Sequence, residues 1–142
     1  MKWSAGGWSL VAAALLGCSS QPPAVRGPLT NDPASTQFYP DRVQPIFQEH
    51  CFRCHGGWNR KGGLNFQTRT GLLKGGNSGP AVVPGDPAKS LLLRLMQHEE
   101  ALDKQGKPMP MPPNKPKLSD ADIDAVARWI EAGALMPQAA YW

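Results

Sequence analysis

The sequence predicts an all-α domain with about three main helices, and three observations lead to this prediction. Apolar residues recur at helical spacing in three separate segments. Residues that commonly cap helices precede two of these segments. Between them the chain is rich in Gly and Pro, which favour loops. We therefore expect helices joined by long loops and no prominent strand.

The first predicted helix runs from about Asp41 to Cys54. Pro45 is tolerated near its beginning, because the first backbone N–H groups of a helix have no partner within it. One apolar stripe at helical spacing is formed by Val43, Ile46, Phe47, Cys51 and Cys54. This stripe places both cysteines on or near the buried face, at the end of the helix.

A shorter helical turn is expected from Thr68 to Lys74, and the second main helix follows a capping signal at Asp86. Pro87 can take the first helical position, because its fixed backbone angle suits a helix and the missing N–H is not needed there. The apolar run "AKSLLLRLMQ" then continues the helix to about Gln97.

The third helix begins at "SDAD", which combines an N-cap at Ser119 with an acidic residue, Asp122, three positions later. This arrangement is similar to a capping box, although the box prefers Glu or Gln at its last position. Gly133 supplies the expected stop. The apolar stripe of this helix consists of Ile123, Val126, Ala127 and Ile130.

The N-terminus has the features of a secretory signal, which we assign to residues 1–17. Lys2 carries a positive charge, and an apolar stretch too short to span a bilayer follows it. The run ending at Cys18 resembles the bacterial lipobox, in which the cysteine is diacylated and becomes the first mature residue. The alternative is an ordinary signal peptide with an incidental cysteine. We expect an exported protein on the periplasmic side, with Cys18 anchored to a membrane; Ser19 favours the outer membrane.

Residues 18–37 are predicted to form a lipidated, disordered tether, and residues 38–142 to form one small domain. The tether is rich in Pro, Ser, Thr and Asn and has almost no large apolar side chain, so it cannot bury enough surface to fold alone. The formal net charge of the whole chain is +4, and removal of the signal also removes Lys2. No basic stripe is interleaved with aromatic residues, so we expect no nucleic-acid partner.

The stretch "EHCFRCHGG" brings together Cys51, Cys54 and His55, which could serve a zinc site, a dithiol redox pair, a disulfide or a covalently attached haem. The chain has three cysteines, and once Cys18 is assigned to lipid none remains for a disulfide framework or a second zinc-binding pair. A dithiol pair of the thioredoxin type follows a strand and opens a helix, whereas this one closes a helix. Two thiols followed directly by histidine suit c-type haem, with His55 binding the iron.

Five stretches of the chain occur in an order that is similar to one known family. They are "VQPIFQEHCFRCHG", "KGGLNFQTRTGLLKGG", "GPAVVPGDPAKSLLLRLM", "MPP" and "LSDADIDAVARWIEAGA". The chain resembles the planctomycete-type cytochrome c group, which are small c-type cytochromes. The resemblance implies the cytochrome c fold, in which the first and last helices cross and one haem c lies in an apolar crevice. It also implies electron transport rather than enzyme activity.

The second axial ligand of the iron is expected to be a methionine, which the resemblance implies. The family's "MPP" aligns on Met111, in a loop stiffened by proline, with Met109 as the alternative. His98 is a competitor, and Met96 is expected to pack in the core. His50 is too close to the attachment site to reach the opposite face of the ring, so we expect it to face solvent or a propionate.

Several apolar residues are expected to pack on or beside the haem: Leu92, Leu95, Ile123, Val126, Trp129 and Ile130, with Phe47 and Trp58 nearby. Protein without haem should then be largely unfolded. The first functional hypothesis is a membrane-tethered electron carrier with His/Met ligation. The second is a haem enzyme or a gas or redox sensor with an open sixth position, and the third is a module in which haem serves only as a core.

Redox partner proteins are the expected partners, and one surface is a candidate for meeting them. Lysines flank the "PMPMPP" loop, and they could steer an acidic redox partner at low ionic strength or simply form ordinary solvated surface. These residues are Lys104, Lys107, Lys115 and Lys117.

Overall fold

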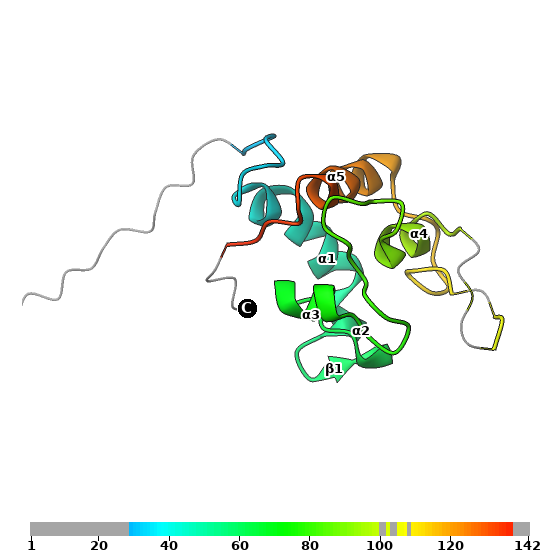
Figure 1. Cartoon of the computed structure of the whole chain (residues 1–142). Coiled ribbons are helices and arrows are strands. Elements are labelled where there is room, and N and C mark those ends of the chain that lie inside the picture. Colours follow the sequence, from blue (N-terminus) through cyan, green and yellow to red (C-terminus); the bar gives the residue numbers. More distant parts are fainter. Residues whose placement is uncertain (1–28, 100–101, 103–104, 108, 138–142) are drawn as a thin grey trace, which may run out of the picture.

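The computed structural model describes residues 29–99, 102, 105–107 and 109–137, and the fold over these residues is mostly helical, as predicted. Figure 1 shows α1 and α5 in the upper half of the molecule, α2, α3 and β1 below them, and α4 to the right. Within this described part, no helix is both long enough and apolar enough to cross a bilayer. This arrangement is compatible with the all-α cytochrome fold.

The first helical region contains a π-helix, η1 (Tyr39–Val43), followed by α1 (Gln44–His50) and α2 (Phe52–His55). A single continuous helix was expected here, and that prediction is wrong at Cys51, whose φ of −121° lies outside the helical range. Backbone hydrogen bonds bridge the break, because the Cys51 N–H donates to the Phe47 carbonyl and the Cys51 carbonyl accepts from the His55 N–H. The break therefore redirects the chain without leaving these groups unpaired.

The predicted helical turn near residue 70 is confirmed as α3 (Arg69–Lys74). The Thr68 hydroxyl caps it by accepting from the Gly71 N–H at 3.0 Å. The Arg69 guanidinium donates to the carbonyl of Ala134 at 2.9 Å and to that of Gly133 at 3.1 Å. These bonds fasten α3 to the segment that follows the last helix.

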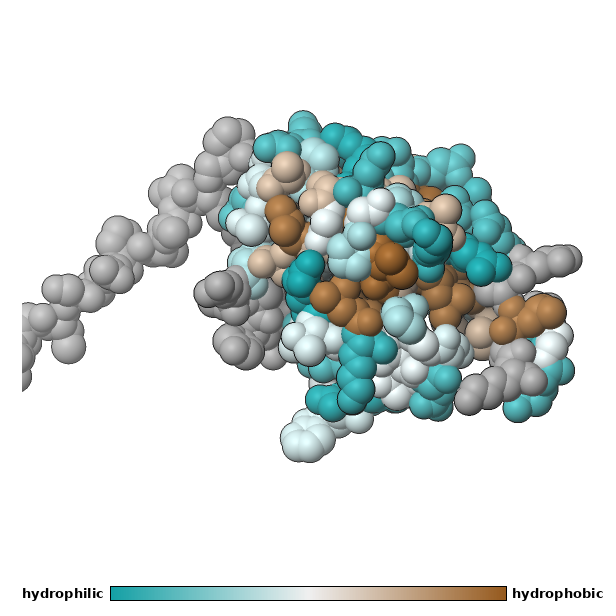
Figure 2. Space-filling view, in the orientation of Figure 1, coloured by the Kyte–Doolittle hydropathy of each residue, from teal (hydrophilic) through white to brown (hydrophobic). Residues whose placement is uncertain are grey.

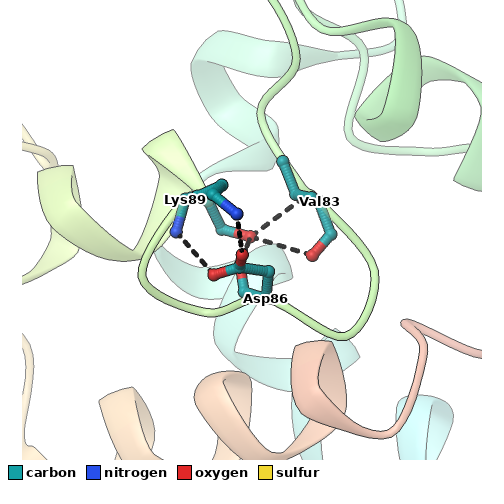
Figure 3. A network of polar contacts seen from close by, with 4 residues as sticks. Val83, Asp86 and Lys89 are labelled. Atoms are coloured by element: carbon teal, nitrogen blue, oxygen red, sulfur yellow. Dashed lines mark hydrogen bonds and ion pairs between the residues drawn. The ribbon is translucent and has the colours of Figure 1, made fainter.

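Helix α4 (Leu91–Met96) begins later than predicted, because Asp86 caps a turn before the helix. Asp86 accepts from the Lys89 N–H, and the buried Ser90 hydroxyl donates to the Asp86 carbonyl at 2.9 Å. Ser90 also accepts from the Val83 N–H at 2.9 Å. Figure 3 shows Val83, Asp86 and Lys89 in this network. These bonds draw residues 86–90 into a compact turn, and Ser90 becomes the N-cap residue of α4.

Helix α5 (Asp120–Glu131) confirms the predicted third helix. The Ser119 hydroxyl oxygen accepts from the Asp122 N–H at 3.1 Å, and its proton is donated to the Asp122 carboxylate at 2.6 Å. A negative charge in the first turn also suits the positive end of the helix dipole. The chain leaves the helix through Gly133, whose φ of 101° suits glycine.

Four buried aromatic side chains form a continuous cluster between η1, α1 and α5, which we call the aromatic core: Tyr39, Phe47, Phe66 and Trp129. The ring centroids of Phe47 and Phe66 lie 4.8 Å apart, and those of Tyr39 and Trp129 lie 5.4 Å apart. The indole N–H of Trp129 donates to the Leu135 carbonyl at 2.8 Å. The core therefore joins the first helical region to the last helix.

The segment 29–37, which the sequence assigns to the tether, is hydrogen-bonded to the domain. The Asn31 carbonyl accepts from the Arg128 guanidinium at 3.0 Å, and the Thr30 N–H donates to the Asp41 carboxylate at 3.0 Å. The first described residues therefore lie against α5 and η1.

Candidate functional site

A deep cleft beside α2 and α4 is the candidate site. Its volume, including the open space at its mouth, is about 910 Å³. Cys51, Cys54 and His55 line one side, and Met109 and Met111 also line it. Most of the remaining lining side chains are apolar. The fold thus brings together all the residues that the sequence analysis assigned to cofactor binding within the domain.

The two cysteines lie at the junction of α1 and α2, and both are partly buried. Burial, and then the neighbouring Cys54 thiol, raise the pKa of Cys51 to about 12. The thiol of Cys51 is therefore protonated at neutral pH. The described residues hold no group of three or more His, Cys, Asp and Glu side chains that could bind a metal ion, so no second ligand pair for zinc stands beside this one.

His55 ends α2 with its imidazole oriented by a backbone carbonyl. Its Nδ1 lies 2.9 Å from the Lys61 carbonyl oxygen, which can only accept, so Nδ1 carries the proton. Burial lowers the pKa of His55 and keeps the ring neutral, although the Lys61 carbonyl acts in the opposite direction. Phe66 packs beside the ring, with centroids 5.5 Å apart. The Nε2 lone pair is therefore available in the form that binds metal ions.

A tight β-hairpin follows the histidine, with His55 paired to Arg60 and Gly56 paired to Asn59. Its strand β1 is Asn59–Arg60. A Cβ atom at Gly56 would stand 2.9 Å from the Phe52 carbonyl oxygen, so the close approach to α2 requires glycine. Gly57 has a φ of 58° at the first position of a two-residue turn, as a type II′ hairpin demands.

The methionine loop is fixed to the helix on the neighbouring wall, because the Met111 N–H donates to the Leu95 carbonyl of α4 at 3.0 Å. The peptide bond between Met111 and Pro112 is cis. Both Met109 and Met111 line the cleft, so the structure leaves both as candidate ligands.

The competitor His98 does not line the cleft. Its Nε2 is buried and has no hydrogen-bond partner among the described residues. The backbone at His98 has a φ of 57°, directly after α4. This histidine therefore lies outside the group of residues that the cleft brings together.

Some residues expected beside the haem lie elsewhere. Leu92 and Leu95 line the cleft as predicted, whereas the apolar residues of α5 do not and pack in the core instead: Ile123, Val126, Trp129 and Ile130. Phe47 is likewise buried in the aromatic core. The expectation for Trp58 is wrong, because its side chain is fully exposed at 105% of the reference area. A tryptophan in a two-residue Gly57-Trp58 turn is held away from the core by the hairpin itself.

The cleft is also lined by three residues that sequence reasoning had placed elsewhere or missed. Met96 was expected to be a core residue; it is fully buried and also reaches the cleft wall. His50, expected to face solvent or a propionate, contributes to the wall as well. Lys61 was missed, because no sequence pattern marks a residue whose backbone carbonyl, rather than its side chain, orients His55.

Only part of the proposed lysine surface can be placed. Lys115 is exposed, whereas the ammonium group of Lys117 lies 2.8 Å from the Asp120 carboxylate, which offsets its charge. Lys107 is exposed too. Lys104, like Cys18 and the signal segment, lies outside the described residues.

Comparison with known proteins gives one match. Residues 51–115 match the model of a family described as Planctomycete cytochrome C. The matched range begins at the first cysteine of the trio and includes both loop methionines. No curated protein and no solved structure gives a match.

Proposed function

We propose that the protein is an exported electron carrier tethered to a membrane. The match of residues 51–115 to the model of a family described as Planctomycete cytochrome C supports a haem-binding, electron-transfer role. One haem c is attached to Cys51 and Cys54 and lies in the cleft. When bound, it supplies a one-electron couple between ferrous and ferric iron. The observation that carries this proposal is the convergence of both cysteines, His55 and the loop methionines on one apolar cleft.

The residues around the cleft fit this group. His55 is neutral, has a free Nε2 and is oriented by the Lys61 carbonyl, which is the usual way in which a protein prepares a histidine ligand. The apolar walls suit a large planar hydrophobic molecule.

Met111 is proposed as the second axial ligand, with Met109 as the alternative. A thioether is neutral and soft, so it favours ferrous iron and raises the reduction potential. The backbone bond from Met111 to Leu95 supports the choice, because it holds this residue against the cleft wall. With both axial positions filled by protein, iron has no open position for a substrate, so the role is electron transfer rather than enzyme catalysis.

The ligand proposal is tested by the absorption spectrum of the purified holoprotein. We expect a low-spin reduced spectrum that carbon monoxide leaves unchanged, and a weak near-infrared sulfur-to-iron band in the ferric form. Met111→Ala should abolish that band, and Met109→Ala, the matched control two residues away, should retain it. Loss of the band only in Met109→Ala reassigns the ligand. Ready binding of carbon monoxide by the wild type indicates the open-site sensor or enzyme instead.

The membrane anchor and the partners complete the proposal. Cys18 carries the lipid on the periplasmic side, and redox proteins exchange electrons with the haem. Mass spectrometry of the mature N-terminal peptide tests the anchor, because a diacylated Cys18 adds the mass of the lipid and an ordinary signal peptide leaves none. Loss of the anchor would not affect the ligand test, which uses only the domain.

A further inference from the structure

The apex of the hairpin presents an apolar aromatic side chain to solvent. Trp58 is fully exposed, and the other exposed large hydrophobic residues of the described part, Leu29 and Leu102, are far from it in the sequence. Figure 1 places β1 at the lower edge of the fold, and Figure 2 shows that this end is covered by hydrophilic and neutral residues, while hydrophobic residues gather across the middle of the face. On the face that Figure 2 shows, the hydrophobic residues are therefore separate from this end of the molecule.

The hairpin holds this tryptophan in a fixed place. The Gly57 N–H donates to the Gln67 side chain at 2.8 Å, and the Asn59 side chain donates to the Arg53 carbonyl at 2.8 Å. The Arg60 guanidinium donates to the Gly57 carbonyl at 3.3 Å. Bonds on both sides of the turn thus preorganise the apex, which lowers the entropy lost when the exposed side chain binds something.

The charge around the apex has one sign. No Asp or Glu occurs between His50 and Gly85 in the sequence. Arg53, Arg60 and Lys61 are exposed, and none of them forms a salt bridge with a described residue. We call Trp58 with these three cations the hairpin tip. It combines one aromatic side chain with uncompensated positive charge, so its binding partner should be anionic.

The shape of the hairpin tip distinguishes between two anionic partners. A specific protein interface buries about 800 Å² on each side, and its energetically dominant residues lie at the centre of a packed apolar patch. A single aromatic ring on a convex turn with polar neighbours does not offer such a patch. The headgroup region of a bilayer needs no complementary pocket, and Trp with Arg or Lys is the combination that lies at membrane interfaces.

We propose that the hairpin tip docks on anionic lipid headgroups, with Trp58 in the interfacial region and Arg53, Arg60 and Lys61 at the lipid phosphates. A contact of this size is weak alone. It rests on the Cys18 anchor of the proposed function to become effective, because a tether raises the local concentration of the domain at the membrane. Docking here turns the His55 side of the cleft toward the lipid surface.

The test uses haem-loaded mature chain without lipid, exported behind a signal that lacks the lipobox, so it requires neither the anchor nor electron transfer. Cosedimentation with vesicles of phosphatidylcholine, alone or mixed with phosphatidylglycerol, is followed at low ionic strength by haem absorbance. We expect binding only to the mixed vesicles, and its loss at high salt. Arg60→Gln should lower the partition coefficient about fivefold, the change that corresponds to ~1 kcal/mol per cation.

Trp58→Ala should weaken vesicle binding several-fold and leave the haem spectrum unchanged, because its side chain touches nothing in the core. Leu102→Ala and Lys115→Gln remove an exposed apolar residue and an exposed cation elsewhere, and should bind as the wild type does. Equal binding of Trp58→Ala and wild type overturns the proposal and leaves nonspecific charge attraction. Absence of wild-type binding at millimolar anionic lipid also overturns it, and favours an acidic protein as the partner.

Discussion

The aromatic core and the cleft lie in the same small domain, yet their apolar side chains are placed in different surroundings. In the aromatic core, Tyr39, Phe47, Phe66 and Trp129 contact one another and are buried by protein alone. In the cleft, apolar side chains line an open space instead. One region buries its apolar side chains against protein, and the other offers them to a ligand.

This difference indicates which part of the buried apolar surface the chain supplies by itself and which part a cofactor would supply. The aromatic core joins η1 and α1 to α5, whereas the cleft would gain its buried surface from the proposed haem. A domain of this size buries a modest core, so the second contribution is large relative to the total. Three predictions follow the comparison in order of expected effect.

Protein made without haem should show no cooperative unfolding transition. A net stability of about 5–15 kcal/mol is typical of small domains, so the loss of the apolar burial that haem would contribute is large relative to the total. Cys51→Ser combined with Cys54→Ser prevents attachment, and circular dichroism during urea denaturation measures the outcome. A sharp, native-like transition in this variant would show that the aromatic core alone is sufficient for folding.

Trp129→Ala in the holoprotein should cost about 3–5 kcal/mol, because it removes the largest fully buried side chain and its hydrogen bond to the Leu135 carbonyl. The matched control is Trp58→Ala, which removes the same side chain from a fully exposed position and should stay within about 0.5 kcal/mol of the wild type. Guanidinium denaturation followed at the haem band measures both. Similar losses for the two variants would contradict the assignment of the core.

The smallest effect is expected at Asp86, which lies in neither region. The pKa of Asp86 is lowered mainly by the hydrogen bond from the side chain of Lys89. Because the folded pKa lies below the unfolded one, the ion pair contributes stability above the ordinary pKa of 3.8 and loses it as pH falls through the lowered value. Asp86→Asn keeps the hydrogen-bond acceptor and removes the charge.

The thermal midpoint of Asp86→Asn should therefore lie slightly below that of the wild type at pH 7, and the two should converge in strong acid. Asp124→Asn, an exposed acidic residue on α5, serves as the control for the change in net charge. If the gap between Asp86→Asn and the wild type is the same at every pH, the ion pair is not its cause.

Local chemistry made part of this structure predictable from sequence. The Ser119 cap acts on a residue three positions away, so the start of α5 could be placed from the sequence. The turn expected from Thr68 to Lys74 is found as α3, with Thr68 as its cap. The family resemblance was also evident from short stretches around Cys51 and His55, and the match over residues 51–115 supports it.

The features that sequence reasoning missed depend on contacts between distant segments. Asp86 caps a turn and not α4, and the buried Ser90 hydroxyl holds that turn together through bonds to Val83 and Asp86, so the helix begins only after Ser90. The apolar stripe of α5 faces the aromatic core instead of the cleft, and periodicity cannot say which of two apolar regions a stripe will meet. Trp58 was misplaced because a large aromatic side chain suggests burial, whereas its position in a two-residue turn exposes it.

The contacts that hold the first and last segments together also determine the order in which parts of the chain fold. Asn31 pairs with Arg128, 97 positions later, and Arg69 binds the carbonyl of Ala134, 65 positions later. Contacts with such long sequence separation form late, because loop closure must precede them. A chain synthesised or translocated from its N-terminus exposes Cys51, Cys54 and His55 well before α5 exists. The proposed attachment site would therefore be accessible to modifying enzymes during an early interval, which ends when the last helix docks.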